Sequence, residues 1–466
     1  MNAIKTKQRH PLIVGTFILT ITGFISRLLG FFYRIYLSRL FGEAEMGVYQ
    51  LLSPVLSLSF ALTAAGYQTA ISKLVAETAA TERRPSFRPV ILGLSISIPL
   101  SLLCNAVLYF FADTIAIRLL QEARTASMLR ILSFSVPLSA IHACVNGYFY
   151  GIKKAGIPAG SQLLEQLVRV GSVYFFSAWS LASGHTPSIS VAILGLTIGE
   201  FCSMLMAVLA VVPRRRLSDS RTAAMTEAPV TQGRRQLPLL HTTFPASQTT
   251  QRLYGKLLAM AIPLTANRIV LNILQSVESV SIPSRLKIYG YDNITALSVY
   301  GVLTGMAMPF IFFPNALTGS IAVLLLPMIS ESYALGDMNA VRKATLRTVK
   351  YCGLLGMCCM GIFVLLGKWM GTSLFHSPLA GYFITTLGFL CPFLYLDTTL
   401  SSILQGLGMA GHIFVMNVIC LLLRLCFVFL AIPQFGITGY LWGLLASQLT
   451  LGLLYLGCLY RFLKKH

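Results

Sequence analysis

Long, nearly uninterrupted apolar runs dominate this chain and decide what it can fold into. Leu, Ile, Val, Phe, Ala and Gly continue through whole stretches such as 89–112. In hydrocarbon a backbone must satisfy its own hydrogen bonds, so such a run belongs to a helix or to a closed barrel. Barrel strands are segments of about ten residues that alternate polar and apolar positions, and these runs do not alternate. We therefore expect an all-α integral membrane protein, with the roughly 20 residues that each crossing helix needs.

Composition supports this class, since charged residues make up only 11% of the sequence and hydrophobic residues 55%. Soluble domains carry about 25% charged residues. The eighth run contains Pro309, Pro314 and Pro327, which predicts an interrupted helix. No cleavable signal is expected, because the first run continues into a charged helix without a small-residue cleavage site. About 12 transmembrane helices are expected, at 12–40, 47–72, 89–112, 127–150, 160–182, 189–212, 256–284, 294–330, 347–367, 380–405, 412–432 and 437–460.

Basic residues between the helices indicate the orientation of the chain. Most of them fall on one side, which includes the N-terminus, the 73–89 loop, the 213–256 segment and the C-terminal tail. The positive-inside rule places this side in the cytoplasm, so both termini are expected there, in a bacterial inner membrane. The net charge of +21 is then a topology signal, and nucleic acid is excluded as a partner because no basic, base-stacking soluble face is present. The opposite side carries Arg118, Arg124, Arg130, Lys287 and Lys368.

The chain is an internal duplication of six helices. The two copies are the N-terminal bundle 1–212 and the C-terminal bundle 254–466, joined by a polar cytoplasmic linker at 213–253. Both copies start in the cytoplasm, so they are parallel repeats around an axis along the membrane normal, an arrangement typical of secondary transporters. An offset of 255 pairs His142 with Asp397, whereas at other offsets Arg34 matches Arg285, Arg27 falls on Glu278 and Glu200 matches Gln448. Adding 255 to Pro137, Gly151, Ala155, Gly156 and Arg169 gives Pro392, Gly406, Ala410, Gly411 and Arg424.

Charges within the spans are the candidate functional residues, because each costs about 2.5–3.5 kcal/mol at the bilayer centre on insertion scales. Arg27 and Arg34 are seven residues apart on one face of the first helix, and Glu278 and Arg285 repeat that spacing on the seventh. The pseudo-two-fold axis should bring these faces together across a central cavity. A structural Arg27–Glu278 bridge and an arginine-lined anion site are both open, since Arg binds phosphate with its planar fork. Arg268 is expected nearby.

The remaining intramembrane charges are candidates for coupling or for structure. Glu165 and Arg169 are four residues apart on one helix, so an internal ion pair is the favoured interpretation. His142 is interpreted as a packed, hydrogen-bonded histidine, with a proton relay as the alternative. Glu200, Asp397 and Arg424 complete this group.

Enzyme chemistry is not indicated. The sequence contains no GxxxxGK[ST] phosphate loop, no HExxH and no GxSxG motif, and these motifs carry nucleotide, zinc and nucleophilic chemistry respectively. The ten cysteines contain no CxxC pair, so they are interpreted as small buried hydrophobes. We expect no cofactor and no metal.

Three runs resemble one transporter family. They are GFISRLLGFFYRIYLSRLFGEAEMGVYQLLSPV in the first half, NGYFYGIKKAGIPAGSQLLEQLVRV around the fourth and fifth helices and SVESVSIPSRLKIYGY in the seventh. They resemble the polysaccharide-exporter branch of the multidrug/oligosaccharidyl-lipid/polysaccharide (MOP) flippase superfamily, including its sporulation members. The resemblance implies a V-shaped pair of pseudo-symmetric six-helix bundles and alternating access. It also implies a substrate linked to undecaprenyl pyrophosphate, such as the peptidoglycan precursor lipid II for spore cortex or cell wall.

Within that resemblance, the related lipid II flippases use cavity arginines on the first helix, and Arg27 and Arg34 are the residues here that match. Many members of the branch have fourteen spans, and this chain is expected to have twelve. Two other functions stay open: a cation-coupled multidrug antiporter centred on Glu278 and Asp397, and a membrane scaffold that recruits cell-wall synthesis enzymes. The expected partners are the lipid-linked oligosaccharide, membrane lipids and those enzymes, and the protein is expected to be a monomer. Glu278 would hold Arg27 until substrate competes for it.

Overall fold

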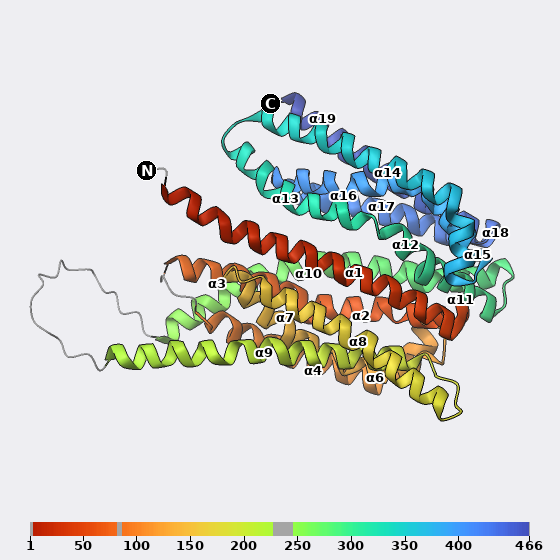
Figure 1. Ribbon diagram of the computed structural model, residues 1–466, viewed down its shortest axis with the longest axis horizontal. Helices are drawn as coiled ribbons and strands as arrows, with labels where there is room; N and C mark the ends of the chain where they lie inside the picture. The colour runs from red at the N-terminus through yellow and green to blue at the C-terminus, as the bar shows by residue number, and fades with distance from the viewer. Residues whose placement is uncertain (1–2, 82–85, 227–245, 466) are drawn as a thin grey trace, which may run out of the picture.

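The computed structural model describes residues 3–81, 86–226 and 246–465, and all of its elements are helices (Figure 1). The N-terminal lobe contains α1 to α9. Its elements are α1 (Ala3–Leu51), α2 (Ser53–Phe60), η1 (Ala61–Ala65), α3 (Gly66–Thr81), α4 (Arg88–Phe110), α5 (Ala112–Thr114), η2 (Ile115–Leu119), α6 (Thr125–Ser133), α7 (Ser135–Gly151), α8 (Gly156–Ala182) and α9 (Ser190–Thr226).

The C-terminal lobe contains α10 to α19. Its elements are α10 (Ala246–Tyr289), α11 (Asn293–Gly301), η3 (Val302–Ala307), α12 (Met308–Phe312), α13 (Asn315–Ala334), α14 (Met338–Phe375), α15 (Pro378–Leu387), η4 (Gly388–Leu390), α16 (Cys391–Gly406), α17 (Ala410–Leu430), α18 (Ile432–Phe435) and α19 (Ile437–Lys465).

Eleven helices of the described chain are long and apolar enough to cross a membrane. One of these segments, Ile18–Ala79, contains the first two predicted spans, because α1 turns back at Gly42 (φ 80°), a conformation that favours glycine. The eighth predicted span is divided at Phe313 and Pro314 into Asn293–Phe312 and Asn315–Ala334, as its prolines predict. Helix α8 is the one predicted span that is not among these eleven segments, and it completes the predicted set of twelve. Its mean hydropathy is lowered by four polar residues, Gln162, Glu165, Gln166 and Arg169.

Local signals explain where several helices begin. The Asp337 carboxylate accepts a hydrogen bond from the Ala340 amide at 2.9 Å, and this starts α14 directly after Gly336 ends the preceding turn. Ser377 does the same for α15, where its hydroxyl accepts from the Ala380 amide at 3.0 Å and Pro378 occupies the first helical position. These caps fix the two turns that join α13, α14 and α15 into one antiparallel set.

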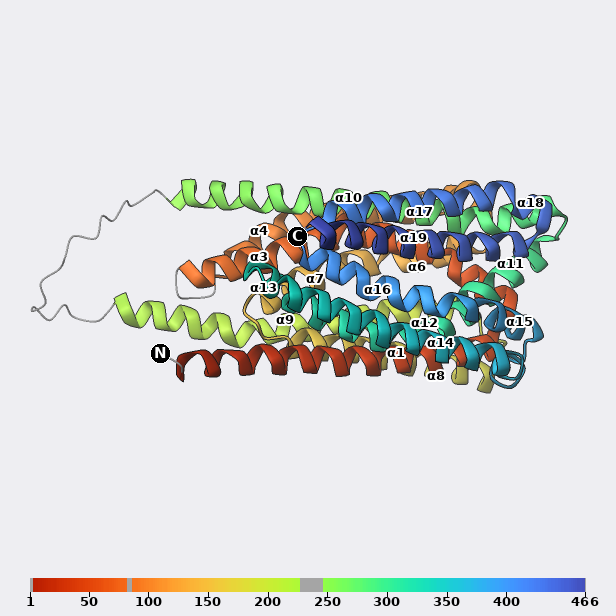
Figure 2. The ribbon, with the colours of Figure 1, turned by 90° about the horizontal axis from the view of Figure 1, so that it is seen from above.

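The two lobes repeat one packing pattern. In the N-terminal lobe α1 packs against α8, and in the C-terminal lobe α10 packs against α17 (Figure 2). Each of these long helices also contacts the opposite lobe, α1 through α11 and α10 through α3. The structure therefore agrees with the duplication that the sequence predicts.

The lobes meet at one end of the molecule and diverge toward the other, which holds both chain termini (Figure 1). We call the end that holds α11 and α15 the convergent end. One hydrophobic core spans both lobes and includes Leu37 and Met46 of α1 together with Tyr300 and Phe383. Two further cores are centred one in each lobe. The predicted V shape is confirmed.

Close backbone contact and polar contacts tie the convergent end together. A Cβ atom on Gly301 would lie 2.3 Å from the Glu43 carbonyl oxygen and 2.4 Å from the Gly47 nitrogen, so only glycine fits. Arg39 donates to the carbonyl oxygens of Leu374 and Ser373 on α14, at 2.8 and 2.9 Å. These contacts join helix α1 to the C-terminal lobe.

A second polar contact between the lobes starts from the loop before α6. Asn293, the first residue of α11, donates from Nδ2 to Glu122 at 2.9 Å. Arg124 donates to the same carboxylate at 2.7 Å and also pairs with Glu45. The Glu122 carboxylate therefore accepts hydrogen bonds from both lobes.

The predicted linker at 213–253 is partly helical, because α9 runs to Thr226 and α10 begins at Ala246. The rest of the linker, 227–245, lies outside the described residues.

Candidate functional site

A cavity of about 510 Å³ lies between the two lobes. Helices α1 and α8 line it from the N-terminal lobe, and the break between α12 and α13 lines it from the C-terminal lobe. The proline-driven interruption of the eighth span therefore forms one wall. The lining residues are Ser26, Arg27, Gly30, Phe31, Tyr33, Arg34, Tyr49, Gln162, Gln166, Arg169, Pro309, Phe312, Phe313 and Asn315.

Three arginines, Arg27, Arg34 and Arg169, line this cavity, and among the described residues no carboxylate does. Arg34 and Arg169 lie close enough for their charges to repel each other. The Arg27 guanidinium lies against α13 at Gly319, where a Cβ atom would be 3.6 Å from Nη1. Arg169 is paired with Glu165, so Arg27 and Arg34 give the lining its excess positive charge. Planar guanidinium groups are suited to the two-pronged binding of phosphate oxygens.

Several polar atoms of this lining have no hydrogen-bond partner within the part of the chain that the structure describes. They are Ser26 Oγ, Tyr33 Oη and Arg169 Nε, all of them buried. Leaving a buried donor unpaired costs about 1–3 kcal/mol. A ligand with several acceptor oxygens would satisfy these groups together.

Aromatic residues bridge the lobes at the cavity wall. The ring of Phe31 on α1 lies 5.2 Å from Phe310 and 5.4 Å from Phe313, and Phe24 lies 6.0 Å from Phe313. These ring pairs are within the range of favourable aromatic contact. They close the wall with apolar surface, which lowers the local dielectric and strengthens the field of the arginines.

The structure places Arg27 and Arg34 in the lining of one cavity, but Glu278 lies in another contact than the one expected. Arg424 Nε of α17 lies 2.7 Å from Glu278 Oε1, and the Tyr440 hydroxyl donates to the same oxygen at 2.7 Å. The expected Arg27–Glu278 bridge is therefore replaced by a pair within the C-terminal lobe. The physical reason is that α17, which carries Arg424, packs against α10, and the Tyr440 hydroxyl of α19 reaches the same carboxylate.

Arg285 and Arg268 also lie away from the cavity lining. The Arg285 guanidinium sits 4.6 Å from the centre of the Phe429 ring, a cation–π contact within the C-terminal lobe. Arg268 is exposed on α10. The pseudo-symmetric half of the predicted arginine site is thus absent from this cavity.

The sequence analysis did not predict that Arg169 lines the cavity. The predicted ion pair with Glu165 already accounted for a charge at this position. That ion pair is confirmed, and Arg169 Nη2 donates to Glu165 Oε1. Gln162, Gln166 and Arg169 recur at four and three residues along an otherwise apolar helix, and this polar stripe is the signal that could have identified all three.

The remaining charged residues form one buried cluster in each lobe. In the N-terminal lobe His142 Nδ1 lies 3.5 Å from Glu200 Oε2. In the C-terminal lobe Gln448 donates to Asp397 at 3.1 Å. These pairs occupy the equivalent positions found by the sequence offsets, so the duplication extends to side-chain contacts.

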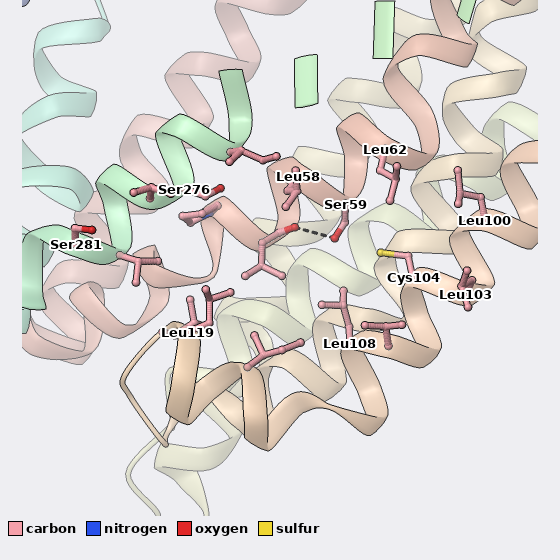
Figure 3. A pocket seen from close by; sticks show the side chains of 18 residues that line it. Leu58, Ser59, Leu62, Leu100, Leu103, Cys104, Leu108, Leu119, Ser276 and Ser281 are labelled. Atoms are coloured by element: carbon pink, nitrogen blue, oxygen red, sulfur yellow. Dashed lines mark hydrogen bonds between the residues drawn. The ribbon is translucent and has the colours of Figure 1, made fainter. Parts of the chain in front are cut away.

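A second cavity, of about 600 Å³, is almost wholly apolar (Figure 3). It lies between α2, α4, η2 and α10. Two of its few hydroxyls, Ser59 and Ser276, already donate to carbonyls of their own helices. This lining suits hydrocarbon and provides nothing for a charged headgroup.

Comparison with known proteins identifies the family. The profile of the polysaccharide biosynthesis protein family matches residues 12–333, well over half of the chain. The chain belongs to this family. It is a multi-pass membrane transporter of the MOP superfamily, as the resemblance of the three sequence runs predicts.

Curated relatives of this family member come from Bacillus subtilis (strain 168). Stage V sporulation protein B is 27% identical over 96% of this chain and 83% of its own length. The lipid II flippase MurJ is 23% identical over 89% of this chain and 76% of its own length. Both alignments extend across both lobes.

Solved structures confirm the fold class. An inward-facing multidrug resistance MATE family transporter of the MOP superfamily has a TM-score of 0.71 at 15% identity, covering 94% of this chain and 96% of its own. The lipid II flippase MurJ, in an inward closed conformation, has a TM-score of 0.70 at 14% identity, covering 95% and 87%. At these identities the likeness concerns the fold alone.

Proposed function

We propose that this transporter moves a lipid-linked saccharide carried on undecaprenyl pyrophosphate, and that lipid II is the substrate to test first. The observation that carries the proposal is the cavity between the lobes with three arginines and no carboxylate. A pyrophosphate brings several negatively charged oxygens, which match three guanidinium groups and the unpaired Ser26, Tyr33 and Arg169 atoms. Its relatives include a protein named as a lipid II flippase.

The mechanism follows from where the cavity lies. Residues from both lobes line it, so a rocking motion of one lobe against the other changes the side from which it is reached. With both termini in the cytoplasm, the divergent end faces the inner leaflet, and the headgroup enters there while its tail remains in hydrocarbon. Opening the other side requires the contacts of the convergent end, such as Gly47 with Gly301, to separate.

A multidrug cation antiporter is less well supported by this site. Organic cations need carboxylates or aromatic faces without competing positive charge, whereas Glu278 is held by Arg424 and Asp397 by Gln448, both outside the cavity lining. A scaffold that recruits cell-wall synthesis enzymes requires no buried arginines. Placing three arginines in membrane-spanning helices without function would be costly.

The experiment is transport of lipid II by purified protein in liposomes. Arg27→Ala and Arg34→Ala are compared with wild type, and Arg285→Ala is the matched control because Arg285 is the repeat equivalent of Arg34 and lies outside the cavity. We expect loss of transport in the two cavity variants and retention in the control, with all proteins monodisperse. If folded wild type neither binds nor moves lipid II, or if Arg285→Ala fails equally, the proposed substrate and site are wrong.

A further inference from the structure

A buried cluster of titratable side chains lies directly behind the arginine cavity. It consists of His142 on α7, Glu165 on α8 and Glu200 on α9. A ring nitrogen of the histidine and one carboxylate oxygen of each glutamate all lie within 4.8 Å of one another. The exposed fractions of these side chains are 12% for His142 and 17% for both glutamates. Two carboxylates held this close in low dielectric repel each other, and they need a positive charge or a proton between them.

The histidine is positioned to carry that proton. Its Nδ1 lies 3.5 Å from Glu200 Oε2. On the other side of the ring, Nε2 lies 2.7 Å from Asn146 Nδ2 and 2.9 Å from Ser203 Oγ. With the Asn146 amide donating, the imidazole is neutral and Nδ1–H faces the carboxylate.

Asn146 can also form a hydrogen bond with His142 when the imidazole is protonated. Its Oδ1 atom is buried without a hydrogen-bond partner among the described residues, and the residue is only 6% exposed. Turning the amide by half a rotation would present Oδ1 to an Nε2–H group, and with Nδ1–H still facing Glu200 this is the imidazolium form. The site therefore has a hydrogen-bonding partner for the histidine in either state.

Arg169 connects this cluster to the cavity. Its Nη2 donates to Glu165, while the residue lines the cavity and its Nε has no hydrogen-bond partner in the described parts of the chain. The other charged or titratable groups that act on Arg169 and Glu165 are Glu200, His142, Tyr33, Tyr49 and, through Arg169, Arg34. An anion in the cavity would compete with Glu165 for Arg169, since both offer oxygen acceptors.

We propose that His142, Glu165 and Glu200 form a proton-binding site that is coupled through Arg169 to anion occupancy of the cavity. When the anion engages Arg169, the charge that neutralises Glu165 and Glu200 is withdrawn, and the cluster takes up a proton in its place. When the anion leaves, Arg169 returns to Glu165 and the proton is released. By reciprocity, protonation favours anion binding. The inference rests on the proposed function only in requiring that the cavity binds an anion.

A metal ion fits this cluster less well than a proton does. Arg169 already occupies Glu165 Oε1, and its charge repels a cation at that position. His142 Nε2 is engaged by Asn146, Ser161 and Ser203. Of these histidine contacts, protonation of Nε2 requires only that the Asn146 amide turn.

The test measures proton uptake when the full-length protein in detergent binds undecaprenyl pyrophosphate. Calorimetric titration in two buffers of different ionisation enthalpy gives the number of protons taken up per anion bound. We expect uptake of up to about one proton in wild type, from the single exchange of positive charge described above. Glu200→Gln and His142→Gln should bind the anion with little or no uptake. Asp397→Asn, at the equivalent place in the other lobe, should behave as wild type.

A second readout separates this inference from the proposed function. Infrared difference spectra should show an imidazolium band that grows on anion binding and disappears in His142→Gln. Anion binding without uptake or band, or binding that depends on added Na⁺ or Zn²⁺ in place of protons, overturns the coupling and leaves the arginine site intact. Failure of wild type to bind the anion overturns both.

Discussion

Glu278 and Arg424 form an ion pair inside the C-terminal lobe, with Arg424 Nε 2.7 Å from Glu278 Oε1. Arg424 is the repeat equivalent of Arg169, which pairs with Glu165 inside the N-terminal lobe. The two arginines share a place in the fold but differ in surroundings. Arg169 lines the large cavity between the lobes, and Arg424 borders a small pocket of about 40 Å³. The two copies therefore differ, and the proposed anion site includes Arg169 but not its repeat equivalent Arg424.

Breaking the Glu278–Arg424 pair should destabilise the protein, because one charge would remain buried alone. We expect Arg424→Gln or Glu278→Gln to lower the free energy of unfolding by about 3–5 kcal/mol. The double variant should recover part of this loss, since no unpaired charge is left. The measurement is thermal unfolding of the purified protein in detergent. Equal losses in the single and double variants would contradict a paired role.

Introducing a carboxylate into the cavity should weaken anion binding. Gln166 lines the cavity on the same helix face as Arg169, so Gln166→Glu places a negative charge beside the guanidinium groups. We expect at least a tenfold loss of affinity for undecaprenyl pyrophosphate, equivalent to about 1.4 kcal/mol. Gln166→Met is the control, because it removes the amide without adding charge. A similar loss in both variants would show that the amide, and not the cavity charge, determines binding.

Much of this architecture can be predicted from the sequence. A hydrophobic run must form a helix in hydrocarbon, and the basic loops predict which side of the membrane they face. The runs give the helices, Pro314 gives the break in the eighth span, and the 255-residue offset pairs Arg169 with Arg424. The four-residue spacing within one helix was also enough to predict the ion pair between Glu165 and Arg169. These features depend on neighbours in the sequence or on direct comparison of the two copies.

Contacts between helices were harder to predict, since they depend on rotation and tilt about each helix axis. Arg27 and Glu278 occupy equivalent faces in the two copies, yet Glu278 turns toward Tyr440 and Arg424. Gly47 and Gly301 gave no signal in the sequence beyond their identity, because their role is a backbone approach between lobes. The roles of Arg268, Asp397 and the cytoplasmic linker at 213–253 stay predictions.

A larger side chain at the Gly47–Gly301 contact should push the two lobes apart at the convergent end. A side chain on Gly301 collides with the Glu43 carbonyl and the Gly47 backbone, neither of which can move as a flexible side chain would. We expect Gly301→Val to increase the distance between spin labels placed on the two lobes at this end, measured by electron–electron double resonance. Gly171→Val on α8 is the control, because nothing lies within 4 Å of a Cβ atom there. Unchanged distances in Gly301→Val would show that this contact does not hold the end closed.

Acidification should weaken the convergent end through Glu122. Burial raises the pKa of this carboxyl, but hydrogen bonds from Arg124 and Asn293 outweigh that effect, so the pKa lies below its ordinary value of 4.5. A carboxylate with a lowered pKa stabilises the closed form fully above its ordinary value, and this contribution is lost as pH falls through the lowered pKa. The contact with Asn293 joins the lobes, so the lost stability is stability of the closed end.

The measurement compares wild type with Glu122→Gln, so that other acid-sensitive groups cancel in the difference. The difference in unfolding temperature should be constant between about pH 7 and pH 5, and it should shrink as pH falls below 4.5, the ordinary pKa of the group. Asp113→Asn serves as the control, because the Asp113–Arg130 pair is exposed and lies within one lobe. Exposed pairs contribute little to stability, so this variant should differ little from wild type at any pH. A Glu122 difference that grows on acidification would reverse the sign of the argument and show that the carboxyl is protonated in the closed form.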